Sequence, residues 1–176
     1  MYAGHFAAGL ALKVAEPRAP VAALLGLVFL PDLLWLGFSI CGLEVVEPSR
    51  WFDGWSHSFA SIILQAVLVG IWWWRRDVGV AAAFAGAVLS HLLLDLPMHP
   101  APLQWYPHAA SGFGDFLHGW AGRSWLFEKT SGWWTEMAVV LLGLAVYLAG
   151  SRRAGVSTAV ATAGALLVLS LQLVFG

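Results

Sequence analysis

Long apolar runs separated by short polar stretches dominate this chain. Five of these runs approach the roughly 20 residues that a helix needs to cross a bilayer; they are Pro20–Ile40, Ser56–Trp74, Val78–Pro97, Trp133–Gly150 and Val156–Phe175. A further apolar stretch, Ala3–Ala15, is too short to cross alone and predicts a tilted or re-entrant helix that lies against the others. Since there is neither an internal repeat nor a linker, we expect one domain over residues 1–176. The pattern predicts an all-α fold: a polytopic membrane helical bundle of about five spanning helices plus the short N-terminal helix.

Composition agrees with a membrane protein. The chain is 60% hydrophobic and 11% charged, whereas soluble domains are about 25% charged. The formal net charge of -1 leaves no basic excess, so we do not expect nucleic acid as a partner. Cys41 is the single cysteine, which excludes an intramolecular disulfide and a thiolate zinc cluster.

The basic residues predict which side of the membrane each connection faces. The short connections hold six of them, namely Lys13, Arg18, Arg75, Arg76, Arg152 and Arg153, and the two long connections hold three, namely Arg50, Arg123 and Lys129. Because basic residues concentrate on the cytoplasmic side, the short connections are expected inside and the long ones outside. We therefore expect a multi-pass protein of the inner (cytoplasmic) membrane. All six histidines then fall on the extracytoplasmic side.

His91 and Asp95 are the strongest candidates for a functional site. They lie four residues apart in an apolar run, so on a helix they share one face. An ionisable group at the bilayer centre costs roughly 2.5–3.5 kcal/mol on insertion scales, so such residues are functional by default. Imidazole and carboxylate at this spacing form half of a divalent metal site. The alternative is a hydrogen bond from His91 to the carbonyl of a neighbouring helix.

Three residues of other apolar runs are candidates for the second half of the site. Asp32 follows Pro31 in an apolar run without a basic neighbour, and its alternative role is to cap a short helix. His57 follows Ser56, which we predict as an N-cap; its alternative is an interfacial histidine without a ligand. His5 stands alone near the outer end of the first helix, where a histidine often has no function.

The remaining candidates are less clearly placed by the sequence. His99 is flanked by Pro97 and Pro100, so it reaches the site only if the chain turns back. Asp53 is either a turn residue or a carboxylate that supports a metal ligand. Glu136, near the start of its helix, either interacts with the helix dipole or serves as a ligand or general base. His108 and His118 are expected to be loop histidines.

These motifs, in this order, resemble those of the predicted membrane-bound metal-dependent hydrolases of bacteria and archaea, also called the LexA-binding, inner-membrane-associated hydrolase family. The matching stretches are Gly4-His5, Leu30-Pro31-Asp32, Trp55-Ser56-His57-Ser58, Leu89–His99 and Gln104–Pro107. The chain departs from many members at Leu34, where they have a second aspartate, and at Phe52-Asp53-Gly54, where they have His-Arg-Gly. The His-x-x-x-Asp arrangement also looks, more distantly, like that of zinc-dependent phospholipase C. The resemblance implies a metal-dependent hydrolase.

Residues and resemblance together predict a membrane-embedded hydrolase with its site at the outer membrane face. The expected ligands, His5, Asp32, His57, His91, Asp95 and His99, exceed the three that a catalytic zinc ion takes from a protein, so one or two ions, most simply Zn²⁺, are expected. Asp32 or Asp95 is expected to bridge the ions or to take a proton in catalysis. A site at headgroup depth favours membrane lipids as partners and a lipid or lipid-linked (phospho)ester as substrate. The alternative is a non-enzymatic metal-binding membrane protein, a transporter or a scaffold; transport is disfavoured because the inner halves of the helices are nearly free of ionisable groups.

Overall fold

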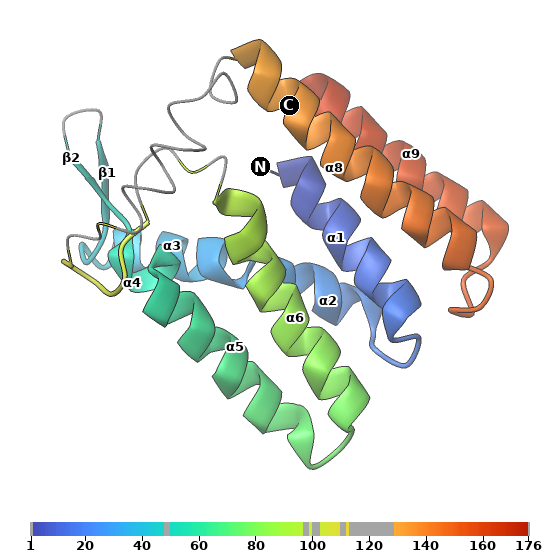
Figure 1. Ribbon diagram of the computed structural model, residues 1–176, viewed down its shortest axis with the longest axis horizontal. Coiled ribbons are helices and arrows are strands. Elements are labelled where there is room, and N and C mark those ends of the chain that lie inside the picture. The colour runs from blue at the N-terminus through green and yellow to red at the C-terminus, as the bar shows by residue number, and fades with distance from the viewer. Residues whose placement is uncertain are drawn as a thin grey trace.

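The computed structural model is a bundle of helices with one small hairpin (Figure 1). It describes residues 2–47, 50–96, 99, 103–109, 112 and 129–175. The helices are α1 (Tyr2–Ala15), α2 (Val21–Val28), α3 (Leu30–Ile40), α4 (Gly54–His57), α5 (Phe59–Trp74), α6 (Val78–Asp95), α8 (Lys129–Gly150) and α9 (Thr158–Phe175). The antiparallel strands β1 (Val45–Glu47) and β2 (Arg50–Phe52) pair Val45 with Phe52. The predicted helical fold class is confirmed.

Fewer helices than the predicted five are long and apolar enough to cross a membrane. Within the described part of the chain, Val78–Asp95 and Trp133–Gly150 qualify, and a third span results if α2 and α3, bent by 52°, are counted as one. The apolar helices Phe59–Trp74 and Thr158–Val174 are shorter. With 16 residues and about 1.5 Å of rise per residue, α5 covers about 24 Å of a hydrocarbon core of about 30 Å.

Helices α5 and α9 both begin later than predicted, because of a cap and a turn in the adjacent sequence. Ser58 caps α5 by accepting a hydrogen bond from the Ser61 backbone N–H, so the separate turn α4 precedes it. The predicted N-cap Ser56 is therefore wrong. Before α9, residues 151–155 form a turn that includes Gly155 in the left-handed region with φ +72°.

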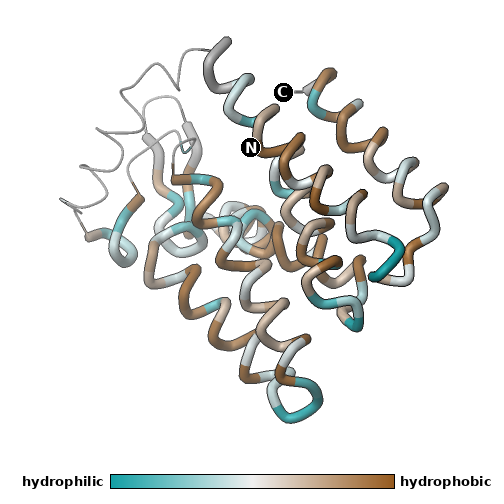
Figure 2. The backbone as a smooth tube through the Cα atoms, turned by 45° about the vertical axis from the view of Figure 1, so that its right-hand side comes forward, coloured by the Kyte–Doolittle hydropathy of each residue, from teal (hydrophilic) through white to brown (hydrophobic). Residues whose placement is uncertain are grey.

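The helices form two packed groups. In the first group, α1 lies against α8 and α9, and its Ala7 is fully buried where Gly143 of α8 approaches (Figure 1). In the second, α5 and α6 pack side by side and α2 packs on α6. Hydrophobic residues cover the helices and hydrophilic residues gather at the turns (Figure 2). Helix α1 joins the groups, since it also contacts α2 and α6.

Glu136 connects α8 to the N-terminus of α1. Its Oε1 accepts hydrogen bonds from the backbone N–H groups of Ala3 at 2.9 Å and Gly4 at 3.3 Å. These N–H groups belong to the first turn of α1, where no partner exists within the helix. Glu136 is therefore a buried cap that fixes the start of the helix carrying His5, and it lies in neither of the two groups of candidate metal ligands described below.

Two of the three predicted cytoplasmic turns meet at the end of the bundle opposite to this cap. The Arg18 guanidinium contacts Asp77 Oδ2 at 2.6 Å and Glu16 Oε2 at 2.8 Å. The turn after α1 is thereby joined to the turn between α5 and α6. Arg18 holds the pKa of the Glu16 carboxyl below its usual value through this contact.

Candidate metal centre

Four helices bring five of the predicted ligands to one end of the bundle. His5 comes from α1, Asp32 from the first turn of α3, His57 from the end of α4, and His91 and Asp95 from the last turns of α6. His5 and His91 are each 1% exposed, His57 is 5% and Asp95 8%, whereas the Asp32 side chain is 36% exposed. The cluster is thus buried on all but one side.

The five side chains form two groups with metal-ligand spacing. One group is His5, His91 and Asp95, and the other is Asp32, His57 and His91. Within each group, one ligand atom per residue lies within 4.8 Å of the others. In the first group Asp95 lies 3.1 Å from His91 Nε2 and 3.6 Å from His5 Nε2. His91 belongs to both groups and therefore lies at the centre of the cluster.

The break between α2 and α3 determines the tautomer of His91. The Val28 carbonyl, at the end of α2, lies 2.8 Å from His91 Nδ1. A carbonyl only accepts hydrogen bonds, so the N–H of a neutral His91 must be on Nδ1. The lone pair is then on Nε2, which faces Asp95 at 3.1 Å and His57 Nε2 at 3.3 Å. The hydrogen bond from His91 to a carbonyl of a neighbouring helix, which the sequence suggested as an alternative to a metal role, is present. It occupies Nδ1 and leaves Nε2 available to a metal.

A buried acid that the sequence analysis missed supports His57. The Ser56 hydroxyl lies 2.7 Å from His57 Nδ1 and donates to both carboxylate oxygens of Glu44, at 3.0 and 2.9 Å. The Ser56 backbone N–H donates to Glu44 as well, at 2.7 Å. Burial raises the pKa of Glu44, which is 2% exposed. A single acid in the apolar stretch Gly42–Val46 was the signal that could have found it.

This chain of contacts directs His57 Nε2 toward the cluster. With the Ser56 hydrogen donated to the Glu44 carboxylate, the Ser56 oxygen accepts the Nδ1–H of His57. His57 Nε2 then carries a lone pair, and this nitrogen lies 3.3 Å from His91 Nε2 and 3.5 Å from Asp32 Oδ1. Among the described residues, the basic side chains in contact with the Asp32 and Asp95 carboxylates are histidines, with no lysine or arginine. Facing lone pairs beside two carboxylates form a set of donors that fits a divalent cation such as Zn²⁺.

His99 and Asp53 form a pair beside the cluster. His99 Nε2 lies 3.1 Å from Asp53 Oδ2, and its ring centre lies 5.7 Å from that of His57. His99, expected as a ligand, therefore lies next to the two groups of three without belonging to either. Asp53 is a turn residue, as one of the two predictions had it, because its carbonyl accepts the backbone N–H of His57 in the α4 turn.

The other two histidines do not contribute to the described cluster. His108 is exposed, has φ +65° and stacks on Phe52 with ring centres 4.2 Å apart. Its backbone N–H donates to Gln104 Oε1. His108 is thus a loop histidine, as predicted. His118 lies outside the described residues.

The contacts of Glu44 predict a measurable effect on metal affinity. Glu44→Gln keeps the shape but places an amide opposite the Ser56 N–H and hydroxyl, so His57 loses its fixed tautomer. We expect zinc affinity to fall by about 10–100-fold, which is typical for the loss of a group that orients a ligand. Competition with a chromophoric chelator measures the zinc affinity of the wild type and of the variant. Glu16→Gln, at a carboxylate that contacts Arg18 in the turn after α1 and lies outside both ligand groups, is the control; equal affinities for the two variants would contradict this role of Glu44.

Comparison with protein-family models, with curated proteins and with solved structures gives no match. The interpretation of the cluster therefore rests on its own geometry and on the motifs in the sequence.

Proposed function

We propose that the protein is a membrane-embedded metal-dependent hydrolase that acts on a lipid or lipid-linked phosphoester. The observation that carries this proposal is the convergence of three imidazoles and two carboxylates in two groups that share His91. The order of motifs, which resembles that of the predicted membrane-bound metal-dependent hydrolases, supports it. We further propose that the protein lies in the inner membrane, that α5 and α9 are embedded despite their length, and that the site opens on the extracytoplasmic side.

One zinc-like ion would be held by His5, His91 and Asp95 or by Asp32, His57 and His91, because the single lone pair of His91, on Nε2, serves one ion; a second ion would be held by the residues of the other group without His91. When bound, such an ion supplies the Lewis acidity that activates water and polarises a phosphoryl or acyl oxygen. The protein holds these ligands through the contacts of their outer nitrogens: Val28 for His91, and Ser56 with Glu44 for His57. His99, paired with Asp53, is an additional ligand or a proton carrier at the edge of the site.

The two carboxylates differ in exposure, which suggests different roles. Asp95 is buried and lies between His5 and His91, so it holds the cluster together. Asp32 has a side chain exposed to 36% and lies 3.5 Å from His57 Nε2. Water and substrate reach Asp32 first, so its Oδ2 is the site that takes the proton from the attacking water. A group in this role contributes about 10²–10⁴-fold to the rate.

A panel of phospholipids and lipid-linked phosphoesters, assayed with purified protein and added zinc, tests the function. We expect metal-dependent release of a product from at least one of them. Asp32→Asn is expected to reduce turnover by about 100-fold or more and to keep the metal held by His5, His91 and Asp95. If the protein binds stoichiometric metal and cleaves no member of the panel, the alternative, a non-enzymatic metal-binding transporter or scaffold, takes the place of the hydrolase.

A further inference from the structure

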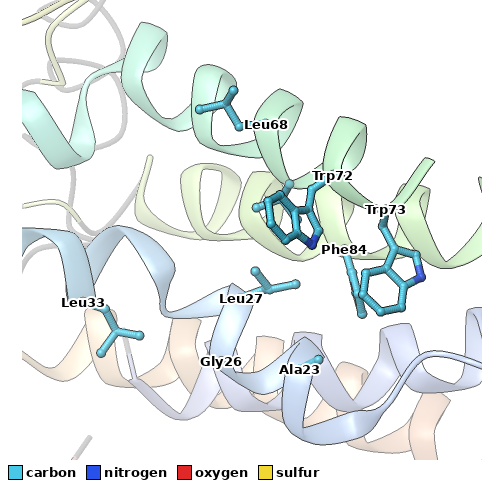
Figure 3. A pocket seen from close by; sticks show the side chains of 9 residues that line it. Ala23, Gly26, Leu27, Leu33, Leu68, Trp72, Trp73 and Phe84 are labelled. Atoms are coloured by element: carbon cyan, nitrogen blue, oxygen red, sulfur yellow. The ribbon is translucent and has the colours of Figure 1, made fainter. Parts of the chain in front are cut away.

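An apolar groove of about 580 Å³ lies between the α2–α3 pair and α5, with Phe84 of α6 at its base (Figure 3). Its lining residues are all apolar; they are Ala23, Gly26, Leu27, Leu33, Leu68, Val69, Trp72, Trp73 and Phe84. Ligand pockets commonly measure about 300–1,000 Å³. Leu33, Leu68 and Trp72 are each more than half exposed, so the groove opens to the surroundings of the bundle.

The groove and the metal centre share the same broken helix. Leu33 lines the groove, and its neighbour Asp32 belongs to the His57–His91 group. Leu27 lines the groove, and its neighbour Val28 binds His91 through its carbonyl. One end of the groove therefore lies beside the polar cluster, and the other lies at Trp73, whose ring is covered by the Arg76 guanidinium at 4.6 Å.

Gly26 keeps the groove open along α2. A Cβ added at this position would meet no atom within 4 Å, and the groove passes over this bare stretch of helix (Figure 3). A second apolar groove of about 290 Å³, on another face of α5, is lined by α5 and α6 alone. It contains no residue of the α2–α3 pair. Of the two, the larger groove is the one connected to the site.

We propose that the groove binds one acyl chain of a phospholipid whose phosphoester lies at Asp32. This inference rests on the proposed function and specifies its substrate class as an acyl-chain lipid. A chain in the groove contacts apolar side chains along its length and places the polar headgroup at the exposed carboxylate. The apolar lining gives no hydrogen bond to a headgroup; the polar part of the lipid lies at the Asp32 end, where the candidate metal ligands are, and not at the Trp73 end beside Arg76.

The test uses a phosphatidylglycerol probe with a diazirine near the end of one acyl chain, in phosphatidylcholine nanodiscs with the full-length protein. After illumination, adducts are mapped by mass spectrometry. We expect adducts concentrated on Leu68–Trp73 and on α2. Gly26→Leu fills the open space and is expected to lower this labelling about tenfold, the scale at which an apolar pocket discriminates by size. Gly37→Leu is the matched control, because a Cβ at Gly37 also meets nothing within 4 Å and Gly37 does not line the groove.

Equal labelling of wild type, Gly26→Leu and Gly37→Leu, or labelling spread evenly over the faces of α5, would overturn the proposal and indicate bulk lipid contact only. The metal content of the same samples separates this failure from that of the proposed function. If the wild-type protein binds zinc but is labelled evenly, the proposed hydrolase function stands and the acyl-chain groove is overturned. If the wild-type protein binds no zinc, the proposed hydrolase function is overturned, whatever the labelling pattern.

Discussion

Replacing His91 by alanine is expected to abolish stoichiometric metal binding. His91 is the residue common to both groups of ligands, so its loss leaves His5 with Asp95 and His57 with Asp32, each a pair instead of a group of three. A catalytic zinc ion takes three protein ligands. Loss of a supporting residue alone costs about 10–100-fold in affinity, so loss of the shared ligand should cost more than about 100-fold.

Metal content by inductively coupled plasma mass spectrometry measures this effect. His108→Ala is the control, since it removes an exposed imidazole that stacks on Phe52 and lies outside both groups. It should keep the wild-type metal content. Circular dichroism on both variants shows whether the helices are retained. A folded His91→Ala protein with full metal content would disprove the central place of His91.

Substituting Gly143 by alanine is expected to destabilise the fold and to weaken metal binding at a distance. The added Cβ would lie 2.9 Å from the Ala7 carbonyl oxygen and 2.9 Å from Ala7 Cβ, both in α1. Because the Ala7 backbone cannot rotate away from the added Cβ as a long side chain could, α1 must move away from α8. Overpacking of this kind costs about 1–3 kcal/mol in the free energy of unfolding. His5 lies on the displaced helix, so the His5–Asp95 contact should loosen too.

Gly164→Ala is the matched control on α9. There the added Cβ meets Tyr147 at 3.9 Å, an ordinary contact, and alanine in a helix is favoured over glycine by about 1 kcal/mol. Thermal unfolding in detergent should show a lower midpoint for Gly143→Ala and an equal or higher one for Gly164→Ala. The same midpoint for both variants would show that the α1–α8 approach is looser than described.

The length of the apolar runs predicted most of the helices, because length and hydrophobicity are local properties of the sequence. It did not predict where α5 begins, since both Ser56 and Ser58 can serve as an N-cap; Ser58 takes this role, while the Ser56 hydroxyl bonds to Glu44. Nor did it predict the count of spans, because two apolar runs lose residues to turns at their ends. The close packing of Gly143 on Ala7 is a contact between distant segments that no local pattern reveals.

The ligand residues were predicted better than their supports. An ionisable group in an apolar helix is costly wherever the helix packs, so Asp32, His91 and Asp95 stood out from sequence alone. Glu44 lies in a loop, where an acid is ordinary, so its apolar neighbours were a weak signal, and its burial shows its importance. For Glu136 the sequence suggested either an interaction with the helix dipole or a role as ligand or general base. Its observed role, the cap of α1, depends on how α8 packs.

The most direct test of the metal centre is anomalous diffraction at the zinc absorption edge from crystals grown with zinc. We expect a peak in contact with His91 Nε2 and with a carboxylate oxygen of Asp95 or Asp32. A second peak beside the remaining residues of the other group would show that the cluster holds two ions. No peak at this cluster, in crystals of protein with well-ordered α1, α3 and α6, would contradict the metal centre and the hydrolase with it.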